Sequence, residues 1–240
     1  MPRFFYPHVL PENSRFDLEE SVARHVLVLR LRVGEVIDLF DGNGGEVPAT
    51  VCDIGRRHLT VETSSRREIE RESSLEITLY QAISMGERMD FTIQKSVELG
   101  VQAIQPLISA RVQQRLDGER AAKKREHWRG VAVAACEQSG RNRIPAVHET
   151  LTFEALLAQP LADQTGFILD PIAGVSLRDY PQPQGKIALL IGPEGGLSPE
   201  EIQQAISAGW QPLQLGPRVL RTETAALTVM AAMQTLWGDF

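Results

Sequence analysis

The sequence predicts an α/β fold: a C-terminal part built on a mainly parallel sheet, preceded by a small β-rich part. From about residue 75, apolar runs typical of buried strands alternate with helical patterns, as expected of a parallel sheet covered on both faces. The first 70 or so residues instead hold short strand patterns closed by tight turns, which favour a small barrel or sandwich. We interpret the strongly charged segment 66–74 as the linker and place the domain boundary within it, between residues 72 and 73.

The N-terminal part is expected to contain one helix and three clear strands. The helix is expected at residues 19–30. A strand at 36–40 runs into the turn signal Asp41-Gly42-Asn43-Gly44-Gly45, and further strands follow at 47–54 and 59–63.

The C-terminal part alternates strands with helices. Gly100 provides a stop for a helix with Met89, Ile93 and Val97 on one face. Asp117 is a suitable cap for the next helix, which carries an apolar stripe that includes Trp128. The expected strands are 75–83, 101–108, 167–169, 187–191 and 211–215, and the expected helices are 87–99, 118–138 and 223–237.

Composition excludes several classes of protein. The chain of 240 residues contains no apolar run as long as the roughly 18 residues that a membrane span needs. The N-terminus lacks the features of a signal peptide. Cys52 and Cys136 form neither a metal-ligand spacing nor a disulfide framework, and the histidines form no such spacing. We therefore expect a cytoplasmic protein with reduced thiols, with no metal and no membrane association.

Charge is unevenly distributed along this acidic chain. The formal net charge is −6, yet residues 111–143 hold nine lysines and arginines against four acidic residues. A local basic segment of this kind can attract a polyanion even when the whole molecule is negative.

The most informative segment is 189–201, in which a buried strand leads through glycines into a helix. Ser198 fits the N-cap, Pro199 the first helical position, and Glu201 completes a capping box. The loop carries Glu194 and no lysine, which excludes the phosphate-binding G-x-x-x-x-G-K-[ST] pattern, and G-x-G-x-x-G is not matched. Such a loop suits a cofactor with polar edges, no phosphate and a positive charge.

A second glycine turn, residues 215–225, also leads from a strand into a helix, with Thr222 as the expected N-cap. Taken alone, this segment favours a helix entry flanked by two solvated arginines over a ligand site. Two glycine loops at the ends of neighbouring strands, however, would line one crevice.

A third cluster, residues 134–145, ends the basic helix with many hydrogen-bonding side chains. It fits either a solvated helix terminus or a surface that contacts phosphates and base edges.

Several motifs together resemble those of the ribosomal small-subunit RNA methyltransferase E family, from end to end and in the same order. They are Arg3-Phe4-Phe5, Gly86-Glu87-Arg88-Met89, residues 94–101, Glu137-Gln138-Ser139-Gly140-Arg141, Gly192-Pro193-Glu194-Gly195-Gly196 and Leu220-Arg221-Thr222-Glu223-Thr224-Ala225.

This resemblance implies a homodimer of the SPOUT class, with a deep trefoil knot in the C-terminal domain and a PUA-like RNA-binding barrel at residues 1–72. It implies S-adenosylmethionine as cofactor and methylation of N3 of a uridine in 16S rRNA, near the decoding site of the assembled small subunit. Two alternatives stay open: another SPOUT reaction such as ribose 2′-O-methylation, and a non-catalytic RNA-binding assembly factor.

The resemblance also implies residue roles. Three knot loops, at 169–174, 191–197 and 215–220, would hold the cofactor. Arg221 and Glu223 are the candidates for catalysis, by stabilising the uracil anion and accepting the N3 proton, and Glu194 is a second candidate base. The expected cofactor-binding residues are Leu169, Asp170, Ile191, Gly192, Pro193, Glu194, Gly195, Gly196, Leu197, Leu215, Gly216, Val219, Leu220 and Thr224. The expected RNA-binding residues are Arg3, Arg111, Arg115, Lys123, Lys124, Gln138, Arg141 and Arg143.

Overall fold

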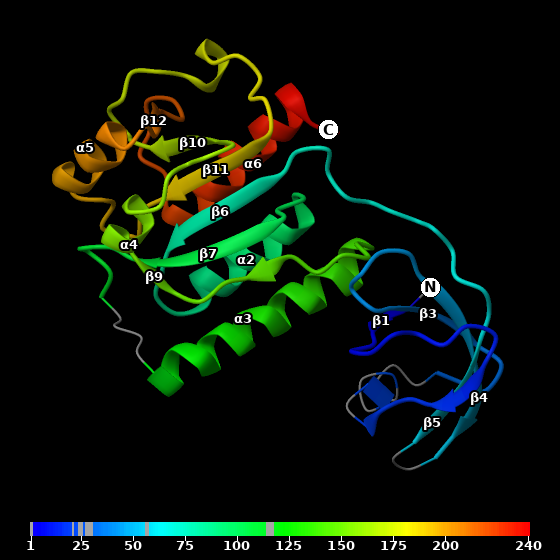
Figure 1. Cartoon of the computed structure of the whole chain (residues 1–240). Coiled ribbons are helices and arrows are strands. Elements are labelled where there is room, and N and C mark those ends of the chain that lie inside the picture. The colour runs from blue at the N-terminus through cyan, green and yellow to red at the C-terminus, as the bar shows by residue number, and fades with distance from the viewer. Residues whose placement is uncertain (1, 21, 24–25, 27–30, 56–57, 114–117) are drawn as a thin grey trace. The chain divides into compact units, whose positions relative to one another are not determined.

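The computed structural model describes residues 2–20, 22–23, 26, 31–55, 58–113 and 118–240 (Figure 1). The chain divides into two compact units. The N-terminal unit comprises Met1–Glu72 and Cys136–Ile144, and the C-terminal unit comprises Ser73–Ala135 and Pro145–Phe240. A single boundary after residue 72 was predicted, and the return of Cys136–Ile144 to the N-terminal unit was not.

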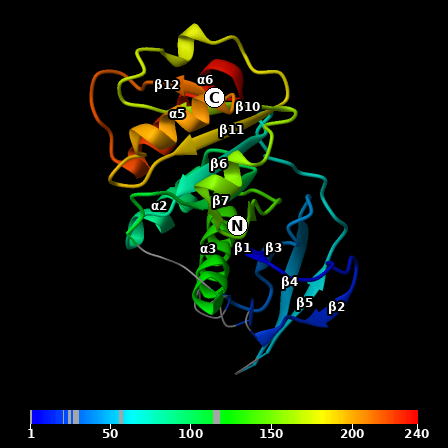
Figure 2. The same cartoon turned by 60° about the vertical axis from the view of Figure 1, so that its left-hand side comes forward.

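The N-terminal unit is built on a sheet with the strand order β1-β3-β4-β5-β2 (Figure 2). β1 runs parallel to β3, and the other pairs are antiparallel. The expected strands at 36–40, 47–54 and 59–63 are confirmed, whereas the two short strands nearer the N-terminus were not predicted. The bounds are Arg3–Phe5 for β1, Arg15–Asp17 for β2, Val36–Phe40 for β3, Val47–Ile54 for β4 and Leu59–Thr63 for β5.

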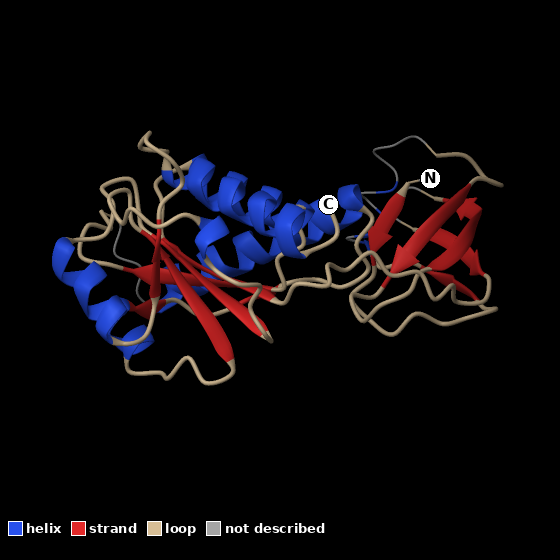
Figure 3. Cartoon of the chain, turned by 90° about the horizontal axis from the view of Figure 1, so that it is seen from above, coloured by secondary structure: helices blue, strands red, loops and turns tan. Residues whose placement is uncertain are grey.

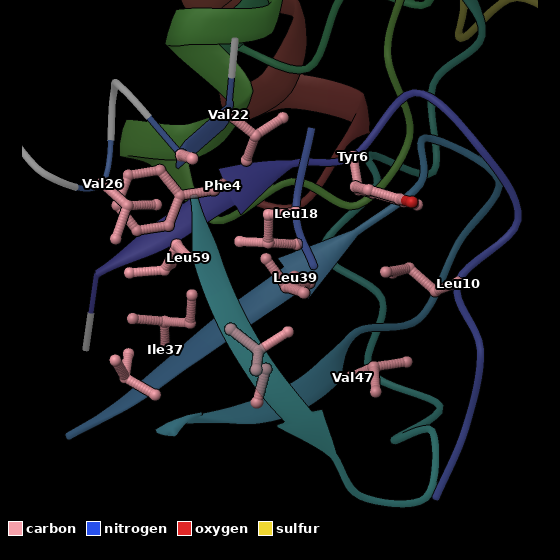
Figure 4. Close-up of a cluster of buried hydrophobic side chains, with 14 residues drawn as sticks. Phe4, Tyr6, Leu10, Leu18, Val22, Val26, Ile37, Leu39, Val47 and Leu59 are labelled. Atoms are coloured by element: carbon pink, nitrogen blue, oxygen red, sulfur yellow. The ribbon is translucent and has the colours of Figure 1, made fainter. Parts of the chain in front are cut away.

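Alternating side chains of these strands form one apolar core (Figure 4). Phe4 from β1 and Ile37 and Leu39 from β3 are fully buried in it. Val22 and Val26, from the expected helix at 19–30, pack into the same core. The remaining positions of that helix lie partly outside the described residues.

The charged segment 66–74, interpreted above as a linker, is attached to the N-terminal unit over its first half. Arg66 pairs with Asp41, Nη2 to Oδ2, at 2.7 Å. Arg67 pairs with Asp38 and with Glu46, whose carboxylate is almost fully buried. The linker interpretation is wrong for these two arginines, because their charges are paired within the N-terminal unit.

The C-terminal unit contains a parallel sheet, as the sequence predicts. In the described residues its order is β12-β10-β11-β6-β7-β8, with β9 also paired to β7, and every pair is parallel. The bounds are Ile77–Ala82 for β6, Ala103–Ile108 for β7, Ala146–Val147 for β8, Leu151–Thr152 for β9, Gln164–Leu169 for β10, Lys186–Ile191 for β11 and Gln211–Leu213 for β12.

Helices cover both faces of this sheet (Figure 3). On one face, α2 and α6 pack against each other. On the other, Ala188 and Leu190 of β11 share a core with Phe153 of α4 and Ala205 of α5. Among the described helices, none combines the length and the apolarity needed to cross a bilayer. The helices are α2 at Glu87–Glu98, α3 at Gly118–Ser139, α4 at Phe153–Leu157, α5 at Pro199–Ser207 and α6 at Thr222–Trp237, with a 3-10 turn at Leu177–Asp179.

Candidate functional site

Three loops of the C-terminal unit enclose a cavity of about 320 Å³. They follow β10, β11 and β12, which are adjacent strands of one parallel sheet, so all three leave the same edge. This is the edge at which open α/β sheets bind ligands. The bends around Gly195 and Gly216 therefore share one hollow. The lining residues are Arg111, Leu169, Asp170, Pro171, Ile191, Gly192, Pro193, Glu194, Gly195, Gly196, Leu197, Ile202, Leu213, Leu215, Gly216, Arg218, Val219, Leu220, Thr222 and Ala225.

The loop after β11 folds back tightly on itself. A Cβ on Gly192 would lie 2.8 Å from the backbone nitrogen of Leu197, closer than any side chain tolerates, so only glycine fits. The loop ends at the predicted capping box: the Ser198 hydroxyl accepts from the Glu201 amide, and the Glu201 carboxylate accepts from the Ser198 amide. Loop and helix are thus fixed as one unit.

The first residue of α6 connects the loop after β11 to the sheet. The Thr222 hydroxyl donates to the carbonyl of Gly192 at 2.6 Å and accepts from the Gln81 side-chain amide at 2.9 Å. The prediction of Thr222 as N-cap is wrong: the N-cap is Arg221, which makes no side-chain capping bond. The Thr222 side chain instead holds two segments in place that are distant in sequence.

Gln214 links the other two loops. Its side-chain carbonyl accepts from the amide of Gly174 at 2.8 Å, and its own amide group donates to the carbonyl of Gly216 at 3.1 Å. The loop after β10 is therefore attached to the loop after β12 by one side chain. Gln214 does not line the cavity, and its role was not predicted from the sequence.

The cavity contains charges of both signs. Arg111 and Arg218 lie in its wall beside Asp170 and Glu194, and no lysine is among the described lining residues. Arg111 donates from Nη1 to the carbonyl of Gly195 at 2.7 Å. A wall of this composition can contact a zwitterionic ligand at both of its charges.

Glu194 is held as a carboxylate. Its Oε1 accepts from the Met85 amide at 2.8 Å and from Arg88 Nη1 at 2.9 Å. Partial burial acts to raise the pKa of Glu194, but hydrogen bonds from its own amide and that of Met85, together with Arg88, lower that pKa below its ordinary value. Glu194 thus contributes negative charge at neutral pH.

Comparisons with known proteins agree with this geometry. Residues 71–234 match the model of an RNA methyltransferase domain, and residues 18–64 match that of an RNA methyltransferase PUA domain. A ribosomal RNA small subunit methyltransferase E from Buchnera aphidicola is 32% identical over 241 residues, which cover 100% of this chain and 95% of that protein. The chain belongs to the ribosomal RNA small subunit methyltransferase E family.

Two solved structures resemble this chain over its whole length. One is a ribosomal RNA small subunit methyltransferase E from Neisseria gonorrhoeae bound to S-adenosyl methionine, at 45% identity and a TM-score of 0.94, covering 100% of this chain and 99% of that one. The other is a putative methyltransferase from Legionella pneumophila in complex with the same cofactor, at 41% identity and a TM-score of 0.95, with the same coverage.

In this member of the methyltransferase E family, the cavity brings together all but one of the residues predicted to bind cofactor. The exception is Thr224, which is exposed on α6 and does not line the cavity. Pro171 and Arg218 also line the cavity and fall within the predicted cofactor loops 169–174 and 215–220, although neither is named there as a ligand. Arg111 was predicted to bind RNA, and Ile202, Leu213, Thr222 and Ala225 were not predicted to line the cofactor site. For most of these residues, the only sequence signal for a place in the cavity was proximity to the glycine motifs. For Arg111 the sequence contained no such signal.

The two candidate catalytic residues lie beside the cavity rather than in its lining. Arg221 is exposed immediately before α6. Glu223 is half-buried in the first turn of that helix, and its Oε2 is buried without a hydrogen-bond partner among the described residues.

The expected RNA-binding residues of the N-terminal unit are mostly engaged within it. Arg3 pairs with Glu46 and donates to Asn142 Oδ1 at 2.5 Å, and its side chain is only 11% exposed. Arg141 is 4% exposed and pairs with Glu72. Burial of both guanidinium groups argues against the phosphate contacts expected of them. Arg143 is exposed, although its Nε lies 3.4 Å from Glu70 Oε2.

The remaining expected RNA-binding residues belong to the basic segment. Lys123 is exposed on α3 in a loose pair with Glu119, and Lys124 lies over the ring of Trp128 at 5.9 Å. Gln138 is exposed near the end of the same helix. Arg115 lies outside the described residues.

Proposed function

We propose that this protein transfers a methyl group from S-adenosylmethionine to N3 of a uridine in 16S rRNA, near the decoding site of the assembled small subunit. One observation carries the proposal: the loops at 169–174, 191–197 and 215–220 enclose a single cavity at the carboxyl edge of the sheet. Relatives that share 45% and 41% of the sequence over the full chain were solved with this cofactor, which supports the same ligand here.

The residues present fit the cofactor. The cavity lies within the range of about 300–1,000 Å³ that small-molecule sites usually have. Asp170 and Glu194 suit a sulfonium and an ammonium group, and the lysine-free wall disfavours a phosphorylated nucleotide. Backbone groups of the glycine loops would recognise adenine and ribose, while Leu215, Val219 and Leu220 would pack on the adenine faces.

The protein must help to remove a proton from the acceptor nitrogen, N3 of uracil. When bound, S-adenosylmethionine supplies an electrophilic methyl group, but the uracil imide is a poor nucleophile while it is protonated. We propose that Glu223 receives that proton; the support is its buried Oε2, which has no partner among the described residues, because such an oxygen is costly unless a donor reaches it. Arg221 would stabilise the anion that develops on the uracil oxygens. Glu194 is a poorer base, because hydrogen bonds from its own amide and that of Met85, together with Arg88, lower its pKa.

The RNA must present an unpaired base, because N3 lies on the Watson–Crick edge. We propose that the basic face of α3, including the exposed Lys123 and the partly exposed Lys124, attracts the surrounding phosphates, with Arg143 and Gln138 contributing at the end of the segment. Arg3 and Arg141 have smaller parts in this proposal than predicted, because both guanidinium groups are largely buried. Binding through such contacts weakens as salt rises.

The finer features of the fold belong to the same proposal. We expect the three cavity loops to form a deep trefoil knot, and the N-terminal sheet to close as a PUA-like barrel. We also propose a cytoplasmic homodimer. Its support in this chain is the alanine-rich surface of α6, where Ala225, Ala231 and Ala232 are not fully buried and would permit close helix packing.

The deciding experiment combines purified protein, radiolabelled S-adenosylmethionine and small subunits that lack the modification, with free 16S rRNA as control. Label in the subunits, followed by digestion and mass spectrometry that places the methyl group on uracil N3, is the expected result. Methyl groups on ribose would indicate the 2′-O reaction. Absence of label from both substrates would contradict an enzymatic function and favour an RNA-binding assembly factor.

A further inference from the structure

The motif Gly86-Glu87-Arg88-Met89 is not among the residues that line the cavity, yet it is attached to the cavity wall. Arg88, in the first turn of α2, donates to Glu194 Oε1 at 2.9 Å, and the amide of Met85 donates to the same oxygen at 2.8 Å. The carboxylate that follows β11 is thus bound by both the side chain and the backbone of the segment that follows β6.

The sheet brings these two segments together. β6 pairs with β11 in parallel, with Gln81 opposite Ile191, so the chain leaves both strands at the same edge. The chain then turns at Gly86, whose φ of +61° is readily adopted only by glycine, and α2 begins without a side-chain cap. This turn directs the Met85 amide and the first turn of α2 toward Glu194.

The contact is polar and partly solvated. The side chains of Arg88 and Glu194 are 44% and 32% exposed. An exposed pair of this kind adds little to the stability of a fold. The position of Glu194 in this ion pair suggests a different role. Glu194 lies between Pro193 and Gly195 in the cavity wall, where a small displacement alters the shape of the site.

We propose that Arg88 is a positioning residue for the cofactor loop: by binding the Glu194 carboxylate it holds residues 193–196 in the conformation that lines the cavity. This inference rests on the proposed function, because it assigns Arg88 to the binding of the same methyl donor. Glu194 then serves as the hydrogen-bond acceptor that joins the two loops, and it does not transfer a proton.

The test uses the full chain and four variants. Arg88→Met removes the charge but retains length, Arg88→Lys retains the charge, Glu194→Gln retains an oxygen acceptor, and the fourth is the double variant Arg88→Met/Glu194→Gln. Lys95→Met is the matched control, since Lys95 forms an ion pair of 2.7 Å with Glu98 on the same helix, away from the cavity. Each protein is titrated with S-adenosylmethionine by calorimetry, and kcat and the KM for the cofactor are measured against pH.

We expect Arg88→Met and Glu194→Gln each to weaken cofactor affinity about three- to tenfold, as loss of a charge-assisted hydrogen bond predicts. Arg88→Lys should recover part of that loss, Lys95→Met should match the wild type, and the double variant should be no weaker than the poorer single variant. The KM for the cofactor should rise more than kcat falls.

Three results would overturn the inference. They are unchanged affinity in Arg88→Met, additive losses in the double variant, or loss of the acidic limb of the kcat profile in Glu194→Gln, which would make Glu194 a base. If the wild type itself binds no S-adenosylmethionine, the proposed function fails as well. That outcome differs from the other three because it concerns the unaltered protein.

Discussion

The glycine loop at 192–196 and the segment Cys136–Ile144 both stand out in the sequence, and the structure uses them in opposite ways. The loop presents backbone to a cavity and has little side chain of its own. The segment turns several of its polar side chains, including Arg141 and Asn142, into the N-terminal unit, while Gln138 and Arg143 stay exposed. Asn142 is fully buried, accepts from Arg3 at 2.5 Å and donates to the carbonyl of Ile69 at 2.5 Å. Glu137 accepts from the amide of Phe5 at 2.9 Å.

This difference shows what each kind of motif can predict. A dense set of hydrogen-bonding side chains reveals that partners exist, but not whether they are phosphates or groups of the same chain. Glycines at the end of a buried strand are more specific, because a close backbone approach is what they permit. The following experiments test that contrast.

The largest effect is expected for Gly192→Ala. The added Cβ would meet the Leu197 amide nitrogen at 2.8 Å and force the cavity loop to move. Affinity for S-adenosylmethionine, measured by calorimetry, should fall about 100-fold or more, equivalent to about 2.7 kcal/mol. Gly130→Ala is the control, because a Cβ there meets nothing within 4 Å; it lies inside α3 and should leave affinity unchanged. Equal affinities of the two variants would show that the loop does not form the site.

The second effect concerns stability and comes from the other region. Arg141→Met removes the partner of Glu72 and should lower the free energy of unfolding by about 3 kcal/mol, because the ion pair is largely buried. Arg143→Met, at an exposed position, should change it by less than about 0.5 kcal/mol. Chemical denaturation measures both. If Arg141→Met keeps full stability but binds small subunits poorly, Arg141 contacts RNA after all.

The sequence was sufficient for the features that depend on local patterns. The strands at 36–40, 47–54 and 59–63 and the capping box at Ser198 follow from alternation and spacing, and the structure has them at those positions. The cavity could be predicted as well, because adjacent parallel strands bring the loops that follow them to one edge of the sheet.

Contacts between distant segments could not be predicted. Thr222 looked like a helix cap, since nothing in the local sequence shows that the carbonyl of Gly192 lies within reach of its hydroxyl. Arg111 looked like a phosphate ligand, since only the folded chain places it against Gly195. The same holds for Arg141 and Glu72, whose pairing depends on the return of Cys136–Ile144 to the N-terminal unit.

A smaller effect is expected for Thr222→Val, which keeps the shape of the side chain and removes its hydroxyl. The carbonyl of Gly192 and the amide of Gln81 then lose a partner, which should cost about 1–3 kcal/mol of stability. Cofactor affinity should also fall, because the loop is released. Thr224→Val, on the exposed side of the same helix turn, is the comparison. If it weakens cofactor binding as much as Thr222→Val, the original prediction that Thr224 binds cofactor is correct.

The smallest effect is a pH dependence in the N-terminal unit. Burial acts to raise the pKa of Glu46, but the hydrogen bond and charge of Arg3, with the charges of Arg67 and Arg71, lower that pKa below its ordinary value of 4.5. A folded-state pKa below the unfolded value means that Glu46 stabilises the fold above about pH 4.5, and that this contribution is lost as the pH falls through the folded-state pKa. The pKa of Asp38 shifts the other way, raised by burial and by the charge of Glu46.

Glu46→Gln should therefore be less stable than the wild type at pH 7, by about 1 kcal/mol, because glutamine still accepts a hydrogen bond from Arg3. Removal of the Glu46 charge also makes the charged form of Asp38 less unfavourable, so the pKa of Asp38 moves back toward its ordinary value. This effect offsets part of the lost stability. Thermal unfolding from pH 7 to pH 3 should show the two melting temperatures converging as Glu46 is protonated. A difference that stays constant over this range would mean that the buried carboxylate contributes through packing, and that its charge adds nothing to the stability of the unit.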